Sequence, residues 1–412
     1  MAKIETGKPA LMRNLNKQIV LNIIRTKKLI SKVEISKISN LKPPTVANIV
    51  KELLEENLIL YKGKGKSNEK GGPRPDLFKL NPEGRFFIGI DIGVKCIVGV
   101  IVNLESEIVY KVSSKDRYET QEELTNILEL IMNSLLDKSK INKFLIEGIG
   151  VGLAAFVDTE KGIAKASNIK VLNDYHIKKI LEEKYRIKVH VENDINLIAI
   201  GGNWSDDKNI RYRNIICVGI RTGIGLGIII NGEVYRGRSG LSGNIGHYPL
   251  FKNGLLCDCG ITGCLETIAG ENAIINNVKE YIVENKDSVK NGLSQLGIKG
   301  IEDVDIDKIY YGLKQNNTII LQITKRALCY LGVIIGKMIQ LFEPHAIIIS
   351  GEIFNHNDIL FDYLVNIAGK YCWKTTFENV QFEKFIITST TIAHSAALQI
   401  IKEFFLNNTL NR

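Results

Sequence analysis

The sequence contains no uninterrupted apolar run that approaches the roughly 20 residues a membrane-spanning helix requires. Its first residues, MAKIETGKPALMRN, lack the apolar core of a signal peptide. Seven cysteines among 412 residues do not make a disulfide scaffold, and free thiols fit a reducing compartment. We therefore expect a cytoplasmic protein. With 45% apolar and 24% charged residues it has the composition of an ordinary soluble chain, and its length suggests two or three domains.

Excess positive charge is confined to one end of the chain. Residues 1–85 carry 18 Lys and Arg against 8 Asp and Glu, whereas the remaining 327 residues carry 36 against 37. The formal net charge of +9 therefore arises in the first fifth of the sequence. A basic segment joined to a neutral body is the electrostatic pattern of a nucleic-acid-binding domain attached to a second function.

The stretch GHYPLFKNGLLCDCGITGCLE, residues 246–266, brings one histidine and three cysteines close together. Structural zinc takes four nitrogen or sulfur ligands in a tetrahedron, and one imidazole with three thiolates supplies them all. We predict a zinc site with the ligands His247, Cys257, Cys259 and Cys264. The alternative is a core histidine among buried thiols, which is the state we expect for the other four cysteines. The C-x-C-x4-C spacing after a nearby histidine favours the metal.

The basic segment has the periodicity of a helix-turn-helix. Apolar spacing predicts a first helix over 11–28, and a capping box, Ser31-Lys32-Val33-Glu34, starts a second. Prolines start a third helix at Pro43, where no amide donor is missed. Its inward face is predicted to consist of Val46, Ile49, Val50, Leu53 and Leu54. Its outward face is predicted to present Thr45, Asn48 and Lys51 to DNA, with Thr45 and Asn48 contacting bases.

Two short strands, 58–61 and 77–80, flank the loop KGKGKSNEKGGPRPD and predict a wing. Cations spaced by glycines along such a loop could follow the phosphates or enter a minor groove. The residues that we expect to contact the DNA backbone are Lys42, Lys51, Lys62, Lys64, Lys66 and Arg74. A solvated basic linker is the alternative interpretation of the loop, because basic Gly-rich loops are commonly just that.

These motifs together resemble the ROK family, which comprises sugar kinases and sugar-responsive transcriptional repressors. The resemblance rests on two motifs. One is the dipeptide GH followed, after nine residues, by CDCGITGCLE, and the other is the GG-P-R-P that precedes an apolar strand. It implies an α/β chain with an N-terminal winged helix-turn-helix, followed by a two-lobed actin-like ATPase fold. The helix-turn-helix domain would cover 1–85 and the first lobe 86–205, completed by 382–412. The second lobe would cover 206–381 and contain the zinc site.

The resemblance also implies a sugar pocket. Asn193 and Asp194 match the family's N-D pair, in which the Asn binds sugar hydroxyls and the Asp is the general base of the kinases. His247 would face the metal with one ring nitrogen and a sugar hydroxyl with the other. The full set of implied sugar-binding residues is Asn168, Asn193, Asp194, Asn244, His247 and Glu266. On residue type alone, an N-cap role for Asn193 or Asp194 is the alternative.

Three departures from the kinase pattern bear on function. The run Asp91-Ile92-Gly93-Val94-Lys95 stands where ROK kinases have D-I-G-G-T, so side chains replace the bare backbone that approaches phosphate. Arg221 replaces a glycine before the Gly-rich turn 222–227, either to meet a sugar phosphate or to cap a strand. Asn244 replaces an acidic residue of the family's pattern. The first change favours a body that no longer holds ATP, whereas Asn244 removes a charge from the pocket and leaves the identity of the ligand open.

We therefore predict a sugar-responsive transcriptional repressor that is not an enzyme and in which Asp194 is a vestigial kinase base. It would bind operator DNA as a homodimer or a dimer of dimers, because one recognition helix reads too few base pairs. Within the family the chain most resembles the xylose repressors, so a sugar such as xylose is the expected effector. One alternative is an ATP-dependent ROK sugar kinase, alone or combined with repression. A weaker one is a module that binds a protein partner.

Overall fold

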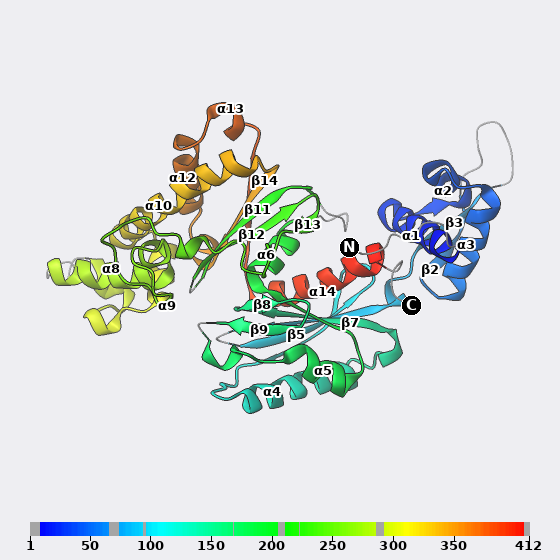
Figure 1. Cartoon of the computed structure of the whole chain (residues 1–412), viewed down its shortest axis with the longest axis horizontal. Helices are drawn as coiled ribbons and strands as arrows, with labels where there is room; N and C mark the ends of the chain where they lie inside the picture. The colour runs from blue at the N-terminus through cyan, green and yellow to red at the C-terminus, as the bar shows by residue number, and fades with distance from the viewer. Residues whose placement is uncertain are drawn as a thin grey trace. The chain divides into compact units, whose positions relative to one another are not determined.

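The computed structural model describes residues 9–65, 74–93, 96–167, 169–204, 211–221, 223–285 and 292–407. The chain divides into two compact units, whose elements are labelled in Figure 1. Unit 1 comprises residues 1–193, 204–209 and 392–412, and unit 2 comprises residues 194–203 and 210–391. The domain boundaries expected from the sequence stay a prediction.

The basic segment folds within unit 1 into helices and a small antiparallel sheet of order β1-β3-β2. Its elements are α1 (Pro9–Lys27), β1 (Ile30–Ser31), α2 (Lys32–Ser39), α3 (Pro43–Glu55), β2 (Ile59–Lys64) and β3 (Asp76–Leu80). The predicted capping box is present, because the Ser31 hydroxyl accepts from the Glu34 amide and the Glu34 carboxylate accepts from the Ser31 amide. Helix α2 ends at Ser39, and the left-handed conformation of its C-cap residue Asn40 turns the chain toward α3.

Helix α3 begins at Pro43 as predicted and buries Val46, Ile49, Val50 and Leu53. One prediction for this helix is wrong, because the Leu54 side chain is 37% exposed rather than packed inward. The buried residues follow the i, i+3, i+4, i+7 stripe of an amphipathic helix, and Leu54 lies one residue further round, at the edge of that stripe.

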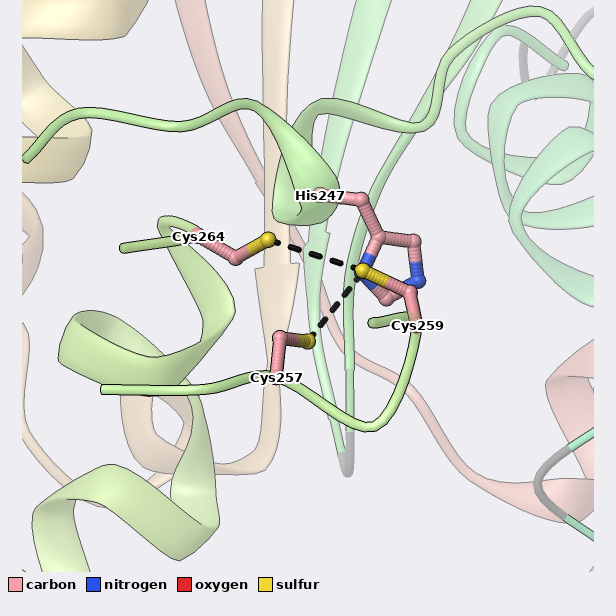
Figure 2. Close-up of side chains that lie close together, drawn as sticks. All are labelled: His247, Cys257, Cys259 and Cys264. Carbon is pink, nitrogen blue, oxygen red and sulfur yellow. Dashed lines mark hydrogen bonds between the residues drawn. The ribbon is translucent and has the colours of Figure 1, made fainter. Parts of the chain in front are cut away.

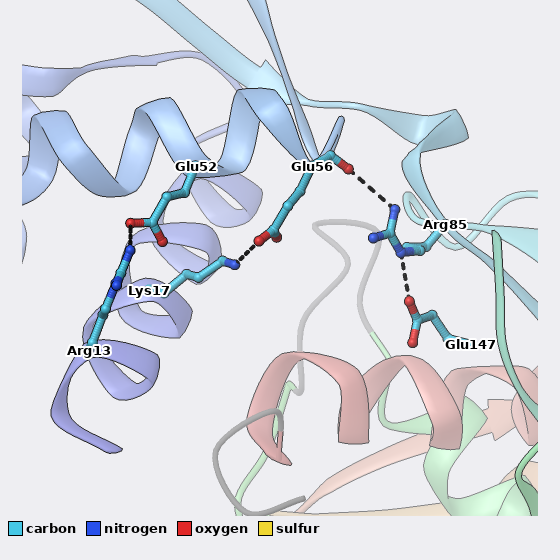
Figure 3. A network of polar contacts seen from close by, with 6 residues as sticks. All are labelled: Arg13, Lys17, Glu52, Glu56, Arg85 and Glu147. Carbon is cyan, nitrogen blue, oxygen red and sulfur yellow. Dashed lines mark hydrogen bonds and ion pairs between the residues drawn. The ribbon is translucent and has the colours of Figure 1, made fainter. Parts of the chain in front are cut away.

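Ion pairs join the helices of the basic segment, and Arg85 joins the segment to the sheet that follows (Figure 3). The pairs between α1 and α3 are Arg13–Glu52 and Lys17–Glu56. The Arg85 guanidinium donates from Nη1 to the Glu56 carbonyl oxygen at 3.3 Å and from Nε to the Glu147 carboxylate at 2.6 Å. The C-terminal end of α3 is therefore held by the residue that precedes β4.

The main sheet of unit 1 has five strands in the order β10-β7-β4-β5-β6. Its strands are β4 (Phe86–Ile92), β5 (Ile97–Asn103), β6 (Ile108–Ser114), β7 (Ile146–Leu153) and β10 (Val189–Asn193), and a separate hairpin pairs β8 (Phe156–Asp158) with β9 (Ile163–Ala166). Strands β4, β7 and β10 are parallel, whereas β5 and β6 extend the sheet antiparallel. Every residue of β4 and β5 is buried, as strands covered on both faces require.

Helices cover both faces of this sheet, and two glycines of the sheet allow the helices to approach it closely. The helices are α4 (Gln121–Asn133), α5 (Ile177–Tyr185) and α14 (Ser389–Asn407), of which α14 belongs to unit 1 from Ile392 onward. A Cβ at Gly89 would lie 1.8 Å from the Ala393 carbonyl oxygen of α14, and one at Gly99 would lie 2.7 Å from Ile131 Cγ2 of α4. Gly99 pairs with the residue after Gly89, so the two glycines face opposite ways and α4 and α14 pack on opposite faces (Figure 1).

Unit 2 is built on a second five-stranded sheet of order β13-β12-β11-β14-β15. Its strands are β11 (Ile215–Ile220), β12 (Ile224–Ile230), β13 (Glu233–Val234), β14 (Ala346–Gly351) and β15 (Gln381–Phe385). Its helices are α6 (Asp194–Gly202), α7 (Glu266–Ala269), α8 (Glu271–Glu284), α9 (Ile306–Lys314), α10 (Thr318–Phe342), α11 (Glu352–Asn355), α12 (Asp358–Lys370) and α13 (Lys374–Phe377). Among the described residues, α10 alone is long and apolar enough to cross a membrane, but 56% of its apolar stretch is buried inside the protein, where it forms part of the core of unit 2.

Candidate functional site

The predicted metal ligands lie together in unit 2 (Figure 2). One ligand atom from each of His247, Cys257, Cys259 and Cys264 lies within 4.8 Å of all the others. The Cys259 and Cys264 sulfurs are 3.6 Å apart, and His247 Nδ1 is 3.5 Å from the Cys257 sulfur. Two sulfurs that each lie about 2.3 Å from a tetrahedral zinc ion are about 3.8 Å apart. The donor set and its spacing therefore fit a tetrahedral dication, and we call these four residues the clip.

The backbone of the clip depends on glycines. Gly260 and Gly263 have φ of +85° and +78°, a region that favours glycine. A Cβ at Gly263 would also lie 1.9 Å from the Phe251 carbonyl oxygen. Gly254 is required for a different reason. Its φ is not positive, but a Cβ there would lie 2.5 Å from the Gly263 Cα, so close approach of two chain segments requires it.

Burial and mutual contact shift the pKa values of the clip thiols. Burial raises the pKa of the Cys264 thiol to about 12, and the neighbouring thiols Cys259 and Cys257 raise it as well. Burial also raises the pKa of Cys257. The pKa of Cys259 is lowered, because hydrogen bonds from the backbone and from the other two thiols outweigh the effect of burial. A thiol that coordinates a metal is deprotonated by it. His247 directs Nδ1 at the sulfurs, so Nε2 lies on the far side of its ring.

Glu266, which follows the clip directly, is fixed against the turn between β11 and β12. Its Oε2 accepts the Ile224 amide at 3.2 Å. A Cβ at Gly223 would lie 2.6 Å from the same oxygen, and one at Gly246 would lie 3.1 Å from it. Two glycines therefore make room for this carboxylate, which stands between the turn and the residue that precedes His247.

The same turn reaches the first residue of α6. Arg221 Nη1 donates to Asp194 Oδ2, and the side chains of Arg221 and Asp194 are 31% and 13% exposed. The Arg221 amide separately donates to the Gly223 carbonyl oxygen at 2.8 Å, which closes the turn. Asp194 and Glu266 are thus both bonded to this turn, Asp194 through Arg221 and Glu266 through Ile224.

The glycines of this hairpin have a packing role. A Cβ at Gly219 would lie 2.3 Å from Ile195 Cδ1, and one at Gly227 would lie 2.6 Å from the Ile195 carbonyl oxygen and 2.7 Å from Ala199 Cβ. Helix α6 therefore presses directly on β11 and β12, and larger residues would separate them. This packing explains why glycines occupy positions 219 and 227, so their presence does not indicate a nucleotide-binding site.

The outward face of α3 is arranged as predicted. Lys42, Asn48 and Lys51 are exposed and Thr45 is partly exposed, on the side opposite the buried stripe. Lys51 lies 3.8 Å from Glu55 on the same helix. In the wing, Lys62, Lys64 and Arg74 are exposed. The prediction for Lys66 falls outside the residues that the structure describes.

Comparison with known proteins identifies the family. A family model described as the ROK family matches residues 87–399. The chain belongs to the ROK family. The ROK match covers both sheets, the clip and the α6 region, and it begins at the second residue of β4.

Two ROK relatives differ in how much of this chain they match. The xylose repressor of Caldicellulosiruptor bescii is 28% identical over 385 residues, which cover 92% of this chain and 93% of the repressor. The glucokinase of Halalkalibacterium halodurans is 30% identical over 303 residues, which cover 72% of this chain and 89% of the kinase. The repressor match is too long to fit within residue 87 to the end of the chain, so it extends into the basic segment.

A solved ROK structure shows the fold. A ROK family transcriptional regulator, described as a homologue of the E. coli MLC protein, aligns with a TM-score of 0.78 and 22% identity over 97% of this chain and 99% of that chain. The predicted fold class is confirmed: an N-terminal winged helix-turn-helix precedes a two-lobed actin-like ROK fold.

The remaining residues expected in a ROK sugar pocket are placed as follows. Asn193, the last residue of β10 in unit 1, donates its side-chain amide to the Ala155 carbonyl oxygen at 2.8 Å. Asn244 in unit 2 donates its side-chain amide to the Leu241 carbonyl oxygen at 2.9 Å. Asn168 lies outside the described residues. The sugar-binding roles of all three stay predictions.

The residue contact that sequence reasoning missed is Arg221 with Asp194. The sequence analysis offered Arg221 a sugar phosphate or a strand cap as partner, but its guanidinium is bonded to the carboxylate that ROK kinases would use as a base. The sequence feature that indicated a contact at this position is the arginine itself, in a turn otherwise rich in glycine. Nothing in the sequence pattern specifies which carboxylate it meets.

Proposed function

We propose that this chain is a sugar-responsive transcriptional repressor, in which a carbohydrate bound to the ROK body changes the affinity of the winged helix-turn-helix for operator DNA. The observation that carries the proposal is the extent of the repressor match, which continues past the ROK body into the basic segment. The exposed polar face of α3 and the exposed wing cations supply the chemistry that such a segment needs.

In the proposed DNA complex, Thr45 and Asn48 of α3 meet base edges in the major groove. Lys42, Lys51 and the wing cations neutralise phosphates, which adds affinity without sequence preference. We propose that two or more copies of the chain bind together, because a single recognition helix covers one half-site. The protein would act in the cytoplasm.

The proposed metal is zinc, bound by the clip residues His247, Cys257, Cys259 and Cys264. Zinc bound by four protein ligands supplies structural bracing and no open coordination position. The bracing would fix the loop that leads into Glu266 and orient the His247 ring, so that Nε2 and the Glu266 carboxylate can accept or donate hydrogen bonds to sugar hydroxyls. Asp194 and Asn193 would complete the carbohydrate contacts.

A DNA-selection experiment tests the repressor function. The full chain is used to select duplexes from a random pool at moderate ionic strength, and the recovered sequences are then measured by fluorescence anisotropy. We expect a two-fold symmetric consensus that binds at least about 1,000-fold tighter than scrambled DNA, the usual lower range for specific recognition. Recovery of no consensus, or binding that does not distinguish the two duplexes, would contradict the proposal.

A second candidate is an ATP-dependent sugar kinase, favoured by the glucokinase match and by the presence of Asp194. The pairing of Asp194 with Arg221 gives this carboxylate a partner within the protein, so the presence of Asp194 does not by itself argue for a kinase. A coupled ATPase assay with xylose, glucose and N-acetylglucosamine distinguishes the two functions. Sugar-dependent turnover above the background of an Asp194→Asn variant would establish a kinase, whereas we expect none.

A further inference from the structure

The side chain of Arg221 makes a contact that its place in the fold does not require. The turn between β11 and β12 is closed by the Arg221 backbone amide, so a residue of any type could close it in the same way. The side chain nevertheless reaches the first residue of α6 and donates to Asp194 Oδ2. Its function must therefore be sought in that carboxylate.

Anchoring α6 does not account for the contact. Ile195 and Ala199 already hold α6 against β11 and β12, where they fill the space left by Gly219 and Gly227. The positive end of the helix dipole also disfavours a cation beside the N-terminus of α6, while it favours Asp194 there. The carboxylate, rather than the helix, is what stabilises the guanidinium at this position.

The charges around Arg221 and Ile224 limit which chemical groups of a ligand can bind there. Asp194 and Glu266 both contact this turn, and the guanidinium that faces it is already bonded to Asp194. A phosphate group would meet two carboxylates and compete with Asp194 for the same guanidinium. A neutral hydroxyl meets no such conflict, because the bond uses one carboxylate oxygen and a carboxylate offers about four lone-pair sites.

We propose that Arg221 is a positioning residue of the effector site, which fixes the Asp194 carboxylate as a hydrogen-bond acceptor for a hydroxyl of an uncharged sugar. Arg221 thereby makes the site select free sugars over phosphorylated ones. The inference rests on the proposed sugar-binding function and specifies the chemical class of the effector.

A double-mutant cycle on the full chain tests this pairing. The variants are Arg221→Ala, Asp194→Asn and the double substitution, and Arg238→Ala is the matched control, because Arg238 is an exposed arginine of the same unit. Calorimetry measures Kd for xylose, glucose and glucose 6-phosphate. We expect Arg221→Ala to weaken binding of the effector sugar by about tenfold or more. The double variant should be no weaker than the weaker single variant, because both remove the same bond.

Two further readouts separate positioning from a structural role. Arg221→Lys keeps the charge and should recover part of the lost affinity. Asp194→Asn releases the guanidinium, so it should narrow the preference for glucose over glucose 6-phosphate, which a merely structural role would not change. If Arg221→Ala lowers the thermal unfolding midpoint, its loss of sugar affinity has a structural component. The role of Arg221 is then judged by the affinity that Arg221→Lys recovers and by the sugar preference of Asp194→Asn.

Each outcome of the cycle has a defined meaning. Equal sugar affinity in Arg221→Ala and Arg238→Ala, or losses that add in the double variant, would overturn the role of Arg221 and leave the repressor proposal intact. Tighter binding of the phosphorylated sugar by the native chain would overturn it as well. If the native chain binds none of the free sugars, the proposed effector function fails and this inference fails with it.

Discussion

Gly260 and Gly263 share a left-handed backbone but differ in their surroundings. A Cβ at Gly260 meets nothing within 4 Å, whereas one at Gly263 meets the Phe251 carbonyl oxygen at 1.9 Å. We expect Gly260→Ala to cost about 1–2 kcal/mol through backbone strain alone. Gly263→Ala should cost more and should disturb the clip, because the 249–251 segment must move.

The measurement for this pair is the rate at which a chelator removes bound metal, followed with a zinc-sensitive dye, together with the thermal unfolding midpoint. Faster metal release is expected from Gly263→Ala than from Gly260→Ala. Equal rates for the two variants would mean that the close contact at Gly263 does not support the metal site.

The clip cysteines give a second prediction at the scale of single residues. Cys264→Ser replaces a buried sulfur ligand, so the purified variant should contain well under one zinc per chain and should unfold at a lower temperature. Cys372→Ser is the matched control, because Cys372 lies outside the clip and should leave the zinc content unchanged. Elemental analysis of the native chain and both variants measures this directly. A native chain without metal would contradict the assignment.

At the scale of elements, helix α3 has core residues on one face and exposed polar residues on the opposite face. Val46, Ile49, Val50 and Leu53 are buried, while Asn48 and Lys51 are exposed on the other side. Asn48→Ala should therefore leave stability nearly unchanged and cost about 1–3 kcal/mol of discrimination at one base position. Lys51→Ala should weaken binding on all sequences and reduce the slope of log K against log salt by about 1.

These two variants act as controls for each other. Anisotropy titrations at several salt concentrations, on the selected duplex and on single-base variants of it, distinguish them. An Asn48→Ala variant with unchanged preference at every position would remove this residue from base recognition, and the assignment of α3 as the recognition helix would need another base-reading residue.

Short sequence motifs predicted helix boundaries in the basic segment. The capping box at Ser31 and the prolines that begin α3 are signals contained within a few residues, and the structure has helix boundaries at both. Leu54 was misplaced because helical periodicity does not say where a buried stripe ends. The order of strands in the two sheets and the Arg221–Asp194 bond depend on residues far apart in the chain, which periodicity does not relate.

At the scale of the whole molecule, the sequence predicted the clip better than the pocket. All four proposed metal ligands lie within eighteen consecutive residues, so their spacing alone indicated a candidate site. The proposed sugar contacts come from separate strands and turns, so no local spacing relates them. Only the family resemblance connects them.

The proposed function also sets a thermodynamic requirement. A sugar can change DNA affinity only by as much as its own affinity differs between the DNA-bound and DNA-free states, and the coupling is reciprocal. The duplex should therefore change the affinity of the protein for sugar by the same factor by which sugar changes its affinity for the duplex.

The most direct test of the account is the affinity of the zinc-loaded full chain for its selected duplex, measured by anisotropy at fixed salt with and without saturating xylose or glucose. We expect one free sugar to change the operator Kd by about 5- to 150-fold, the usual range of allosteric coupling, while the same sugar leaves binding to scrambled DNA unchanged. An operator Kd that is identical with and without every sugar that the chain binds would contradict the central claim.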